Sequence, residues 1–203
     1  MKFFAGNIYH IYNQGNNRQQ TFFSRNDYLD FLKLYRKEIA PNCETLCYCL
    51  MPNHFHFLAY ANEKSINEFK LGNLTIQKLA DGYRRMLSTY STGVAKRINR
   101  TGAFFKPKTK AKEMEAKGRS IISSEEFCFH YIHQNPWRAG LVSNASDWEF
   151  SSLQDYEGAR PGTICNRDLA FELFGWGKSA FKSPEEKLAL DENKRRIIYD
   201  SEK

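Results

Sequence analysis

The sequence predicts an α+β protein with a ferredoxin-like split βαβ fold. We expect an antiparallel sheet with helices on one face, followed by a C-terminal helical extension. Two observations support this class. Periodic patterns follow one another in the order β-α-β-β-α-β-α, which is a split βαβ unit plus one further helix. The chain has 203 residues, 41% of them hydrophobic and 15% aromatic, which is enough to bury the core of one domain.

Four stretches have the pattern of strands. Residues 3–13 alternate between two sets of side chains, and residues 44–51 form a second strand. A tight turn at residues 52–53 leads into a third strand that begins at His54. Residues 104–114 also look extended, and they complete the predicted sheet.

Two helices are predicted between these strands. The first begins at a cap at Ser24 or Asn26 and ends before Pro41. The second runs from Ser65 to about Ile98, where apolar residues recur at three- and four-residue steps, with a break at Gly72. A third helix, after the last strand, begins at Ser123 or Ser124 and is described below with its candidate site residues.

Charge and cysteine content narrow the functional class. The net charge of +7 favours a polyanionic partner, either nucleic acid or an anionic membrane surface. The longest apolar runs are too short to span a membrane, and the N-terminal residues do not form a signal peptide. The odd number of cysteines, five, indicates free thiols in a reducing cytoplasm. Their spacing does not fit a zinc site, so we expect them to be core residues.

The first candidate site is the His54-Phe55-His56-Phe57 segment. Successive side chains on a strand point to opposite faces, so His54 and His56 share one face while Phe55 and Phe57 enter the core on the other. Two imidazoles about 6–7 Å apart at Cα can converge on one metal ion. Taken alone, such a pair is more often two ordinary histidines, so the interpretation needs further residues.

The second candidate site is on the last predicted helix of the core. Tyr131 and Asn135 are one turn apart and therefore face the same way, whereas His133 points elsewhere. We expect this helix to end near Asn135, because Pro136 disfavours helix for the residue before it. The alternative is that Tyr131 only packs in the core and Asn135 only caps the helix.

Together these residues predict a metal site with an adjacent nucleophile. An amide oxygen from Asn135 suits Mg²⁺ or Mn²⁺, and imidazole tolerates Mn²⁺. A phenol is a weak nucleophile at neutral pH, and a divalent ion on a scissile phosphate would help Tyr131 to attack it. The predicted cofactor is therefore Mg²⁺ or Mn²⁺.

A basic segment between Tyr83 and Lys112 predicts contact with nucleic acid. It has nine basic residues and no acidic residue, so its charge of +9 exceeds the net charge of +7 of the whole chain. Its last four lysines alternate with other residues, so on a strand they would form a row about 6–7 Å apart that fits a phosphodiester backbone. Nearby aromatic residues are candidates to stack on unpaired bases: Tyr83, Tyr90, Phe104 and Phe105. The alternative is a solvated edge strand that resists pairing.

Four segments resemble the HUH endonucleases, specifically the single-tyrosine transposases and most closely the REP-associated tyrosine transposase branch. They cover roughly residues 5–157. In order they are Tyr9-His10-Ile11 with Gly15-Asn16-Asn17-Arg18, Cys49-Leu50-Met51-Pro52-Asn53-His54-Phe55-His56, Tyr131-Ile132-His133-Gln134-Asn135-Pro136-Trp137-Arg138-Ala139-Gly140-Leu141-Val142, and Trp148-Glu149-Phe150-Ser151-Ser152 with Tyr156.

The resemblance implies specific roles. His54, His56 and Asn135 would bind Mg²⁺ or Mn²⁺, and Tyr131 would be the nucleophile. The reaction would cut single-stranded DNA beside a palindromic hairpin through a 5′-phosphotyrosine link. The residues expected to contact nucleic acid are Asn16, Arg18, Arg84, Arg85, Arg97, Arg100, Lys106, Lys108, Lys110, Lys112 and Arg138. Gln14 and Trp137 depart from the family, which usually has Arg and a small aliphatic residue there.

Domain limits and assembly follow from the same segments. We expect a transposase domain at residues 1–157 and an extension of unknown role at residues 158–203, with a charged final helix from about Pro184. The protein would act as a monomer or a homodimer, and in a dimer Tyr131 could serve the partner's histidines by helix exchange.

A second functional class remains open. A split βαβ sheet with basic and aromatic residues is also typical of RRM-like modules, which bind single-stranded RNA or DNA without catalysis. Such a module would bind independently of metal and would take RNA at least as well as DNA.

Overall fold

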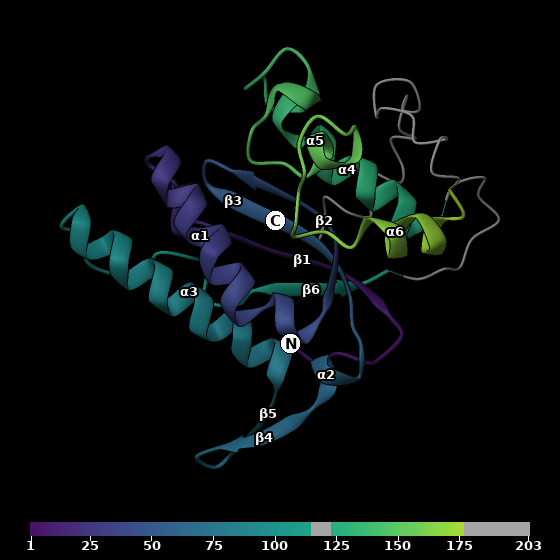
Figure 1. The fold of residues 1–203 in the computed structure, drawn as a ribbon. Coiled ribbons are helices and arrows are strands. Elements are labelled where there is room, and N and C mark those ends of the chain that lie inside the picture. Colours follow the sequence, from purple (N-terminus) through teal and green to yellow (C-terminus); the bar gives the residue numbers. More distant parts are fainter. Residues whose placement is uncertain (115–122, 177–203) are drawn as a thin grey trace.

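The computed structural model describes residues 1–114 and 123–176 of the chain (Figure 1). Four strands form one sheet in the order β2-β3-β1-β6, and every pair in it is antiparallel. They are β1 (Ile8–Gln14), β2 (Glu44–Met51), β3 (His54–Tyr60) and β6 (Lys110–Glu113). With the two helices below, this is the predicted ferredoxin-like order, and the α+β class is confirmed.

Helices cover both faces of this sheet. On one face, α1 (Arg25–Glu38) and α3 (Lys78–Arg97) pack together, as expected for the two helices of the split βαβ unit (Figure 1). On the other face, α4 (Ser124–Arg138) crosses β2 and β3. The shorter helices are α2 (Glu63–Ile66), α5 (Leu153–Tyr156) and α6 (Arg167–Phe174), with single 3₁₀ turns at Asn16–Arg18, Ala40–Asn42 and Ala145–Asp147.

The alternation of β3 divides its side chains between two cores. Phe55 and Phe57 are fully buried among residues of α1 and α3, as predicted. Leu58 lies on the opposite face, in a second core with residues of α4. The two histidines of β3 share that second face, so the strand is fixed by its aromatic face and presents imidazoles on the other.

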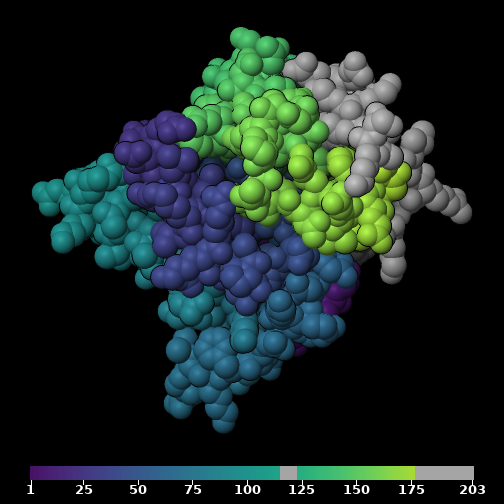
Figure 2. Space-filling model, in the orientation of Figure 1, coloured from purple at the N-terminus to yellow at the C-terminus, as the bar shows by residue number. Residues whose placement is uncertain are grey.

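Residues 65–98, predicted as a mainly helical stretch, are not a single helix. They contain a two-stranded hairpin, β4 (Glu68–Leu71) and β5 (Leu74–Gln77), before α3 begins. Gly72 has a φ of 59° at the first position of the two-residue turn, which suits a type II′ hairpin turn. This hairpin projects from the rest of the molecule at the bottom of Figure 2.

Two other predicted boundaries are also wrong. Helix α4 continues through Pro136 to Arg138 instead of ending near Asn135, because packing of its buried residues offsets the backbone hydrogen bond that proline lacks. Of the stretch 104–114 that looked extended, only Lys110–Glu113 forms a regular strand beside β1.

The segment after α4 closes the free edge of β2. The backbone N–H of Leu50 donates to the carbonyl of Phe150, and the N–H of Ser152 donates to the carbonyl of Tyr48, at 2.9 and 3.0 Å. Farther on, residues of α6 pack on the second core. Part of the predicted extension therefore lies against the domain, and the boundary at 157 stays a prediction. The charged helix expected from Pro184 lies outside the described residues.

Candidate metal and nucleic-acid site

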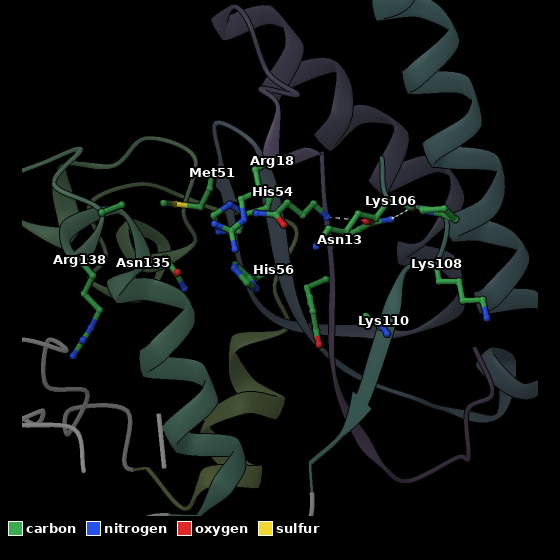
Figure 3. A pocket seen from close by; sticks show the side chains of 14 residues that line it. Asn13, Arg18, Met51, His54, His56, Lys106, Lys108, Lys110, Asn135 and Arg138 are labelled. Atoms are coloured by element: carbon green, nitrogen blue, oxygen red, sulfur yellow. Dashed lines mark hydrogen bonds between the residues drawn. The ribbon is translucent and has the colours of Figure 1, made fainter. Parts of the chain in front are cut away.

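A pocket of about 760 Å³ brings the predicted metal ligands together. It lies between α4 and the strands β1 and β3, and its walls include His54, His56 and Asn135 (Figure 3). Figure 3 shows Asn135 reaching from α4 toward the two histidines. The two strand residues and the helix residue are almost eighty positions apart in sequence and converge on one space.

Hydrogen bonds orient His54. Its Nδ1 lies 2.6 Å from the side-chain oxygen of Asn53, which can only accept. His54 therefore carries its proton on Nδ1, and its Nε2 keeps a lone pair. Burial lowers the pKa of His54 to about 4, although part of its surface reaches the pocket, so the imidazole is neutral at pH 7. A neutral imidazole with an unprotonated nitrogen is the form that binds metal.

His56 pairs with a histidine from the neighbouring strand. Its Nδ1 lies 2.9 Å from Nε2 of His10, and the two rings stack with centroids 5.1 Å apart. Burial is the main cause that lowers the pKa of both, to about 3 for His10. If His56 binds a metal through Nε2, it must donate from Nδ1 to His10, which a neutral His10 can accept. A hydrogen bond of this kind holds many metal-binding imidazoles in place.

The amide of Asn135 is oriented in the same way. Its Nδ2 donates to the backbone carbonyl of Tyr131 at 2.9 Å, one helical turn earlier. Because a carbonyl only accepts, the amide oxygen is the atom left for other partners. Asn135 is 8% exposed and lines the pocket, so that oxygen is available as the third ligand of the predicted set.

Tyr131 lies beside the histidines but is closed off from solvent. Its ring centroid is 5.9 Å from that of His56 and 6.3 Å from that of His10. Only 1% of the residue is exposed, and it does not line the pocket. A second tyrosine, Tyr12 of β1, does line the pocket, with its ring 6.1 Å from His56. The predicted nucleophile therefore has a nearby competitor.

The donor set fits a hard or borderline divalent ion. Two neutral imidazole nitrogens and one amide oxygen suit Mn²⁺ and admit Mg²⁺. Within residues 1–114 and 123–176, no three His, Cys, Asp or Glu side chains are grouped to hold a metal. The cysteines are not part of it: four are buried and Cys165 is half-buried, as expected for core residues.

Basic side chains line the pocket from three directions. Lys106, Lys108 and Lys110 follow one another along one wall, with Arg18 and Arg138 on others. The predicted single row of lysines on a strand is wrong, because Lys106 and Lys108 precede β6. The fourth lysine, Lys112, is half-buried on β6 opposite His10 and does not line the pocket.

The arginines of α3 have acidic partners that lie outside the basic segment. Arg84 pairs with Asp81, and Arg85 pairs with Glu38 and Asp81. Arg97 pairs with the buried carboxylate of Asp27. These helix residues lie across the sheet from the histidines, and their predicted contact with nucleic acid stays a prediction.

Other predicted nucleic-acid residues are placed as follows. The guanidinium of Arg100 lies 4.9 Å from the centre of the Phe104 ring. Asn16 is half-buried, and its backbone N–H donates to the carbonyl of Phe104. The four aromatic residues expected to stack on bases are 7% exposed or less, so that expectation is wrong for this conformation: they are Tyr83, Tyr90, Phe104 and Phe105.

Comparisons with known proteins agree with this geometry at the level of the fold. No family model matches the sequence, and no curated protein matches it. A solved structure of a REP-associated tyrosine transposase bound to a REP hairpin superposes with a TM-score of 0.56, over 81% of this chain and 87% of that chain. This chain has the fold of a REP-associated tyrosine transposase. Identity to that transposase is 14%, so the likeness concerns the fold, and residue roles depend on the site itself.

Two residues of the site were given no role by the sequence. His10 was only part of a motif, although its alternation with Tyr12 on β1 put it on the histidine face. Asn53 was only a turn residue, and nothing local indicates that its side chain holds His54. The register that pairs Tyr12 with His56 brings His10 close to His56, whereas the contact of Asn53 with His54 comes only from the side-chain geometry.

Proposed function

We propose that this protein is a metal-dependent transposase or site-specific endonuclease that cuts and rejoins single-stranded DNA next to palindromic hairpins. The reaction would pass through a 5′-phosphotyrosine on Tyr131. The cofactor would be Mn²⁺ or Mg²⁺ bound by His54, His56 and Asn135. The cytoplasm is the proposed location, and the choice between monomer and homodimer stays a prediction.

One observation carries this proposal. Two imidazoles and an amide, all able to bind a metal, share a pocket, and the helix that supplies the amide also supplies a tyrosine packed against His56. The fold is that of a transposase solved with a REP hairpin, which supports a hairpin-bearing substrate. No described helix is long and apolar enough to cross a membrane.

The chemical step assigns a task to each residue. The Tyr131 oxygen attacks phosphorus, a new tyrosyl ester bond forms to the 5′-phosphate, and the bond to the 3′-oxygen breaks. The phenolic proton passes to solvent, and the 3′-oxygen takes a proton from solvent and leaves as a hydroxyl. A bound divalent ion would polarise the phosphate and stabilise its developing charge. Rejoining reverses the step with another 3′-hydroxyl, so no ATP is needed.

Two features of this chain affect how the site would bind and cut DNA. The three lysines and two arginines around the pocket can neutralise phosphates, which makes binding depend strongly on salt. Because Tyr131 is buried, its reaction requires α4 or the pocket wall to shift when substrate binds.

The alternative, an RRM-like binding module, is disfavoured by the architecture. RRM modules stack bases on aromatic side chains of an open sheet face. Here α4 packs over β2 and β3 on the face that α1 and α3 leave free, and the candidate stacking residues are buried.

A gel assay tests the proposal. A library of labelled single-stranded oligonucleotides with hairpins is incubated with the full-length protein and Mn²⁺, and covalent adducts are resolved under denaturing conditions. We expect the wild type to form an adduct with some hairpins, and expect Tyr131→Phe to form none. His54→Ala should lose the adduct while it keeps most of its DNA affinity.

Tyr12→Phe is the matched control, because Tyr12 is the other tyrosine beside His56. It should still form the adduct. An adduct that survives in Tyr131→Phe and disappears in Tyr12→Phe would transfer the nucleophile to Tyr12. Equal binding of RNA, without metal dependence or adducts, would support the binding module instead.

A further inference from the structure

The turn between β2 and β3 is held by the loop that follows β1. The N–H of Gly15 donates to the backbone carbonyl of Asn53 at 2.7 Å. The N–H groups of Thr21 and Phe22 both donate to the carbonyl of Pro52, at 2.8 and 3.1 Å. The turn that begins the histidine strand therefore takes its position from residues 15–22.

The side chain of Asn53 extends this attachment to the metal site. Its Nδ2 donates to the backbone carbonyl of Arg18 at 3.0 Å, and its Oδ1 lies 2.6 Å from Nδ1 of His54. A carbonyl only accepts, so the contact with Arg18 fixes which end of the amide is the oxygen. That oxygen only accepts, so the proton between the two side chains belongs to His54.

The loop is shaped to present that carbonyl. Asn17 and Arg18 have φ values of 55° and 58°, the left-handed region that side-chain-bearing residues rarely adopt. Gly15 allows a close approach: a Cβ there would lie 2.0 Å from the carbonyl oxygen of Gln19. Backbone strain of this kind gathers at functional sites. Here the strained residue Arg18 also lines the pocket with its side chain.

From these contacts we infer that Asn53 is a positioning residue for His54, set in turn by the backbone carbonyl of Arg18. The inference rests on the proposed metal site. Asn53 keeps the proton of His54 on Nδ1, so Nε2 faces the pocket with a free lone pair. Arg18 has two separate tasks, because its carbonyl orients Asn53 while its guanidinium is available to a phosphate.

A purely structural role for Asn53 makes different predictions. If Asn53 only stabilises the turn, its loss lowers folding stability but leaves the tautomer of His54 unchanged. Second-shell partners typically change metal affinity about 10- to 100-fold when they are removed. The tautomer and the metal affinity are therefore the two informative readouts.

The experiment uses full-length ¹⁵N-labelled protein and needs no DNA. Long-range ¹H–¹⁵N spectra of the metal-free protein at pH 7.5 report which nitrogen of His54 is protonated, with His54→Gln used for assignment. We expect Nδ1–H in the wild type and mainly Nε2–H in Asn53→Ala. Asn53→Asp, which keeps an acceptor, should restore Nδ1–H. Calorimetric titration with Mn²⁺ should show about 10- to 100-fold weaker binding for Asn53→Ala.

Asn62→Ala is the matched control for lost turn stability, because Asn62 caps α2 through its side chain and does not line the pocket. It should change neither readout. Arg18→Gly removes the guanidinium, so it should weaken binding of a hairpin oligonucleotide. Glycine tolerates the left-handed backbone at this position, so the carbonyl that orients Asn53 should stay in place and the His54 tautomer should not change.

The outcomes separate this inference from the proposed function. An unchanged His54 tautomer in Asn53→Ala overturns the inference, whatever the protein does to DNA. A wild type that binds no Mn²⁺ overturns the proposed metal site, and the spectra still decide whether Asn53 sets the tautomer. A changed tautomer with unchanged Mn²⁺ affinity would also overturn the positioning role.

Discussion

Phe57 of β3 provides the sharpest test of how this strand is built. It is fully buried, and its ring stacks on Tyr35 of α1 at 4.1 Å between centroids with a 9° angle between planes. The ring centroids of Phe55 and Tyr48 lie 5.7 and 5.9 Å from that of Phe57. Because β3 lies between β2 and β1, this contact joins the middle of the sheet to the helical layer.

Phe57→Ala should therefore lower the free energy of unfolding by about 3–5 kcal/mol, the usual cost of emptying a fully packed phenylalanine site. Against a typical total of about 5–15 kcal/mol, that is a large loss. The measurement is urea unfolding at 25 °C followed by circular dichroism, with the slope of the transition checked for two-state behaviour.

His54→Ala is the control on the opposite face of the same strand. His54 is half-buried, and its replacement removes one hydrogen bond to Asn53, so we expect a loss of about 1 kcal/mol or less. A Phe57→Ala loss below about 1.5 kcal/mol, or equal losses in both variants, would refute the division of β3 into a core face and a site face.

Three further predictions concern charge, pH and the C-terminal segment. Replacing Lys106, Lys108 and Lys110 by Ala should lower the slope of log binding constant against log salt concentration by about 2 for single-stranded DNA. The same change at three exposed lysines outside the pocket should leave that slope unaltered: Lys64, Lys70 and Lys78. Equal slopes for the two triple variants would show that DNA does not bind along the pocket lysines. Burial lowers the pKa of His10 to about 3, below an unfolded value of about 6.5, so in EDTA this group should decrease the free energy of unfolding by about 1.4 kcal/mol per unit as pH falls from about 6.5 toward 3. The slope should be smaller in His10→Asn, and urea unfolding with no loss between pH 7 and 5 would contradict the assignment of buried neutral histidines. Ser152→Ala should cost about 1–3 kcal/mol, since the buried Ser152 hydroxyl contacts Tyr48 and His133, whereas Ser143→Ala, at an exposed serine, should stay within about 0.5 kcal/mol in the same assay.

Local periodicity was enough to predict most of the sheet and the histidine face. Residues 44–51 were predicted as a strand, and they form β2 within the same limits. The face shared by His54 and His56 follows from the two-residue period of a strand, and the shared orientation of Tyr131 and Asn135 follows from the helical turn. These features depend only on near neighbours in sequence.

The β4–β5 hairpin was missed because its apolar spacing fits two structures. Phe69 and Ile76 fit a helical pattern across residues 65–98, yet they also pair across the hairpin. The glycine at position 72, which has a positive φ, does not separate the two, because a break in a helix and a type II′ turn both accommodate it. Sequence periodicity does not separate these two cases in a short apolar stretch.

Long-range partners account for the other differences. The basic segment looked unpaired because it contains no acidic residue, but Asp27, Glu38 and Asp81 reach the α3 arginines from elsewhere in the fold or from the preceding turn. The contacts of His10 with His56 and of Asn53 with Arg18 likewise join residues about 46 and 35 positions apart. Such pairings depend on register and loop geometry.

The proposed function requires that Tyr131 becomes covalently bound to DNA beside a metal held by His54, His56 and Asn135. The most direct measurement is peptide mapping by mass spectrometry of the adduct formed with a hairpin oligonucleotide and Mn²⁺. We expect one modified peptide, with Tyr131 linked to a 5′-phosphate and with a free 3′-hydroxyl on the released strand. Linkage at Tyr12, or cleavage that leaves a free 5′-phosphate and unmodified protein, would contradict it.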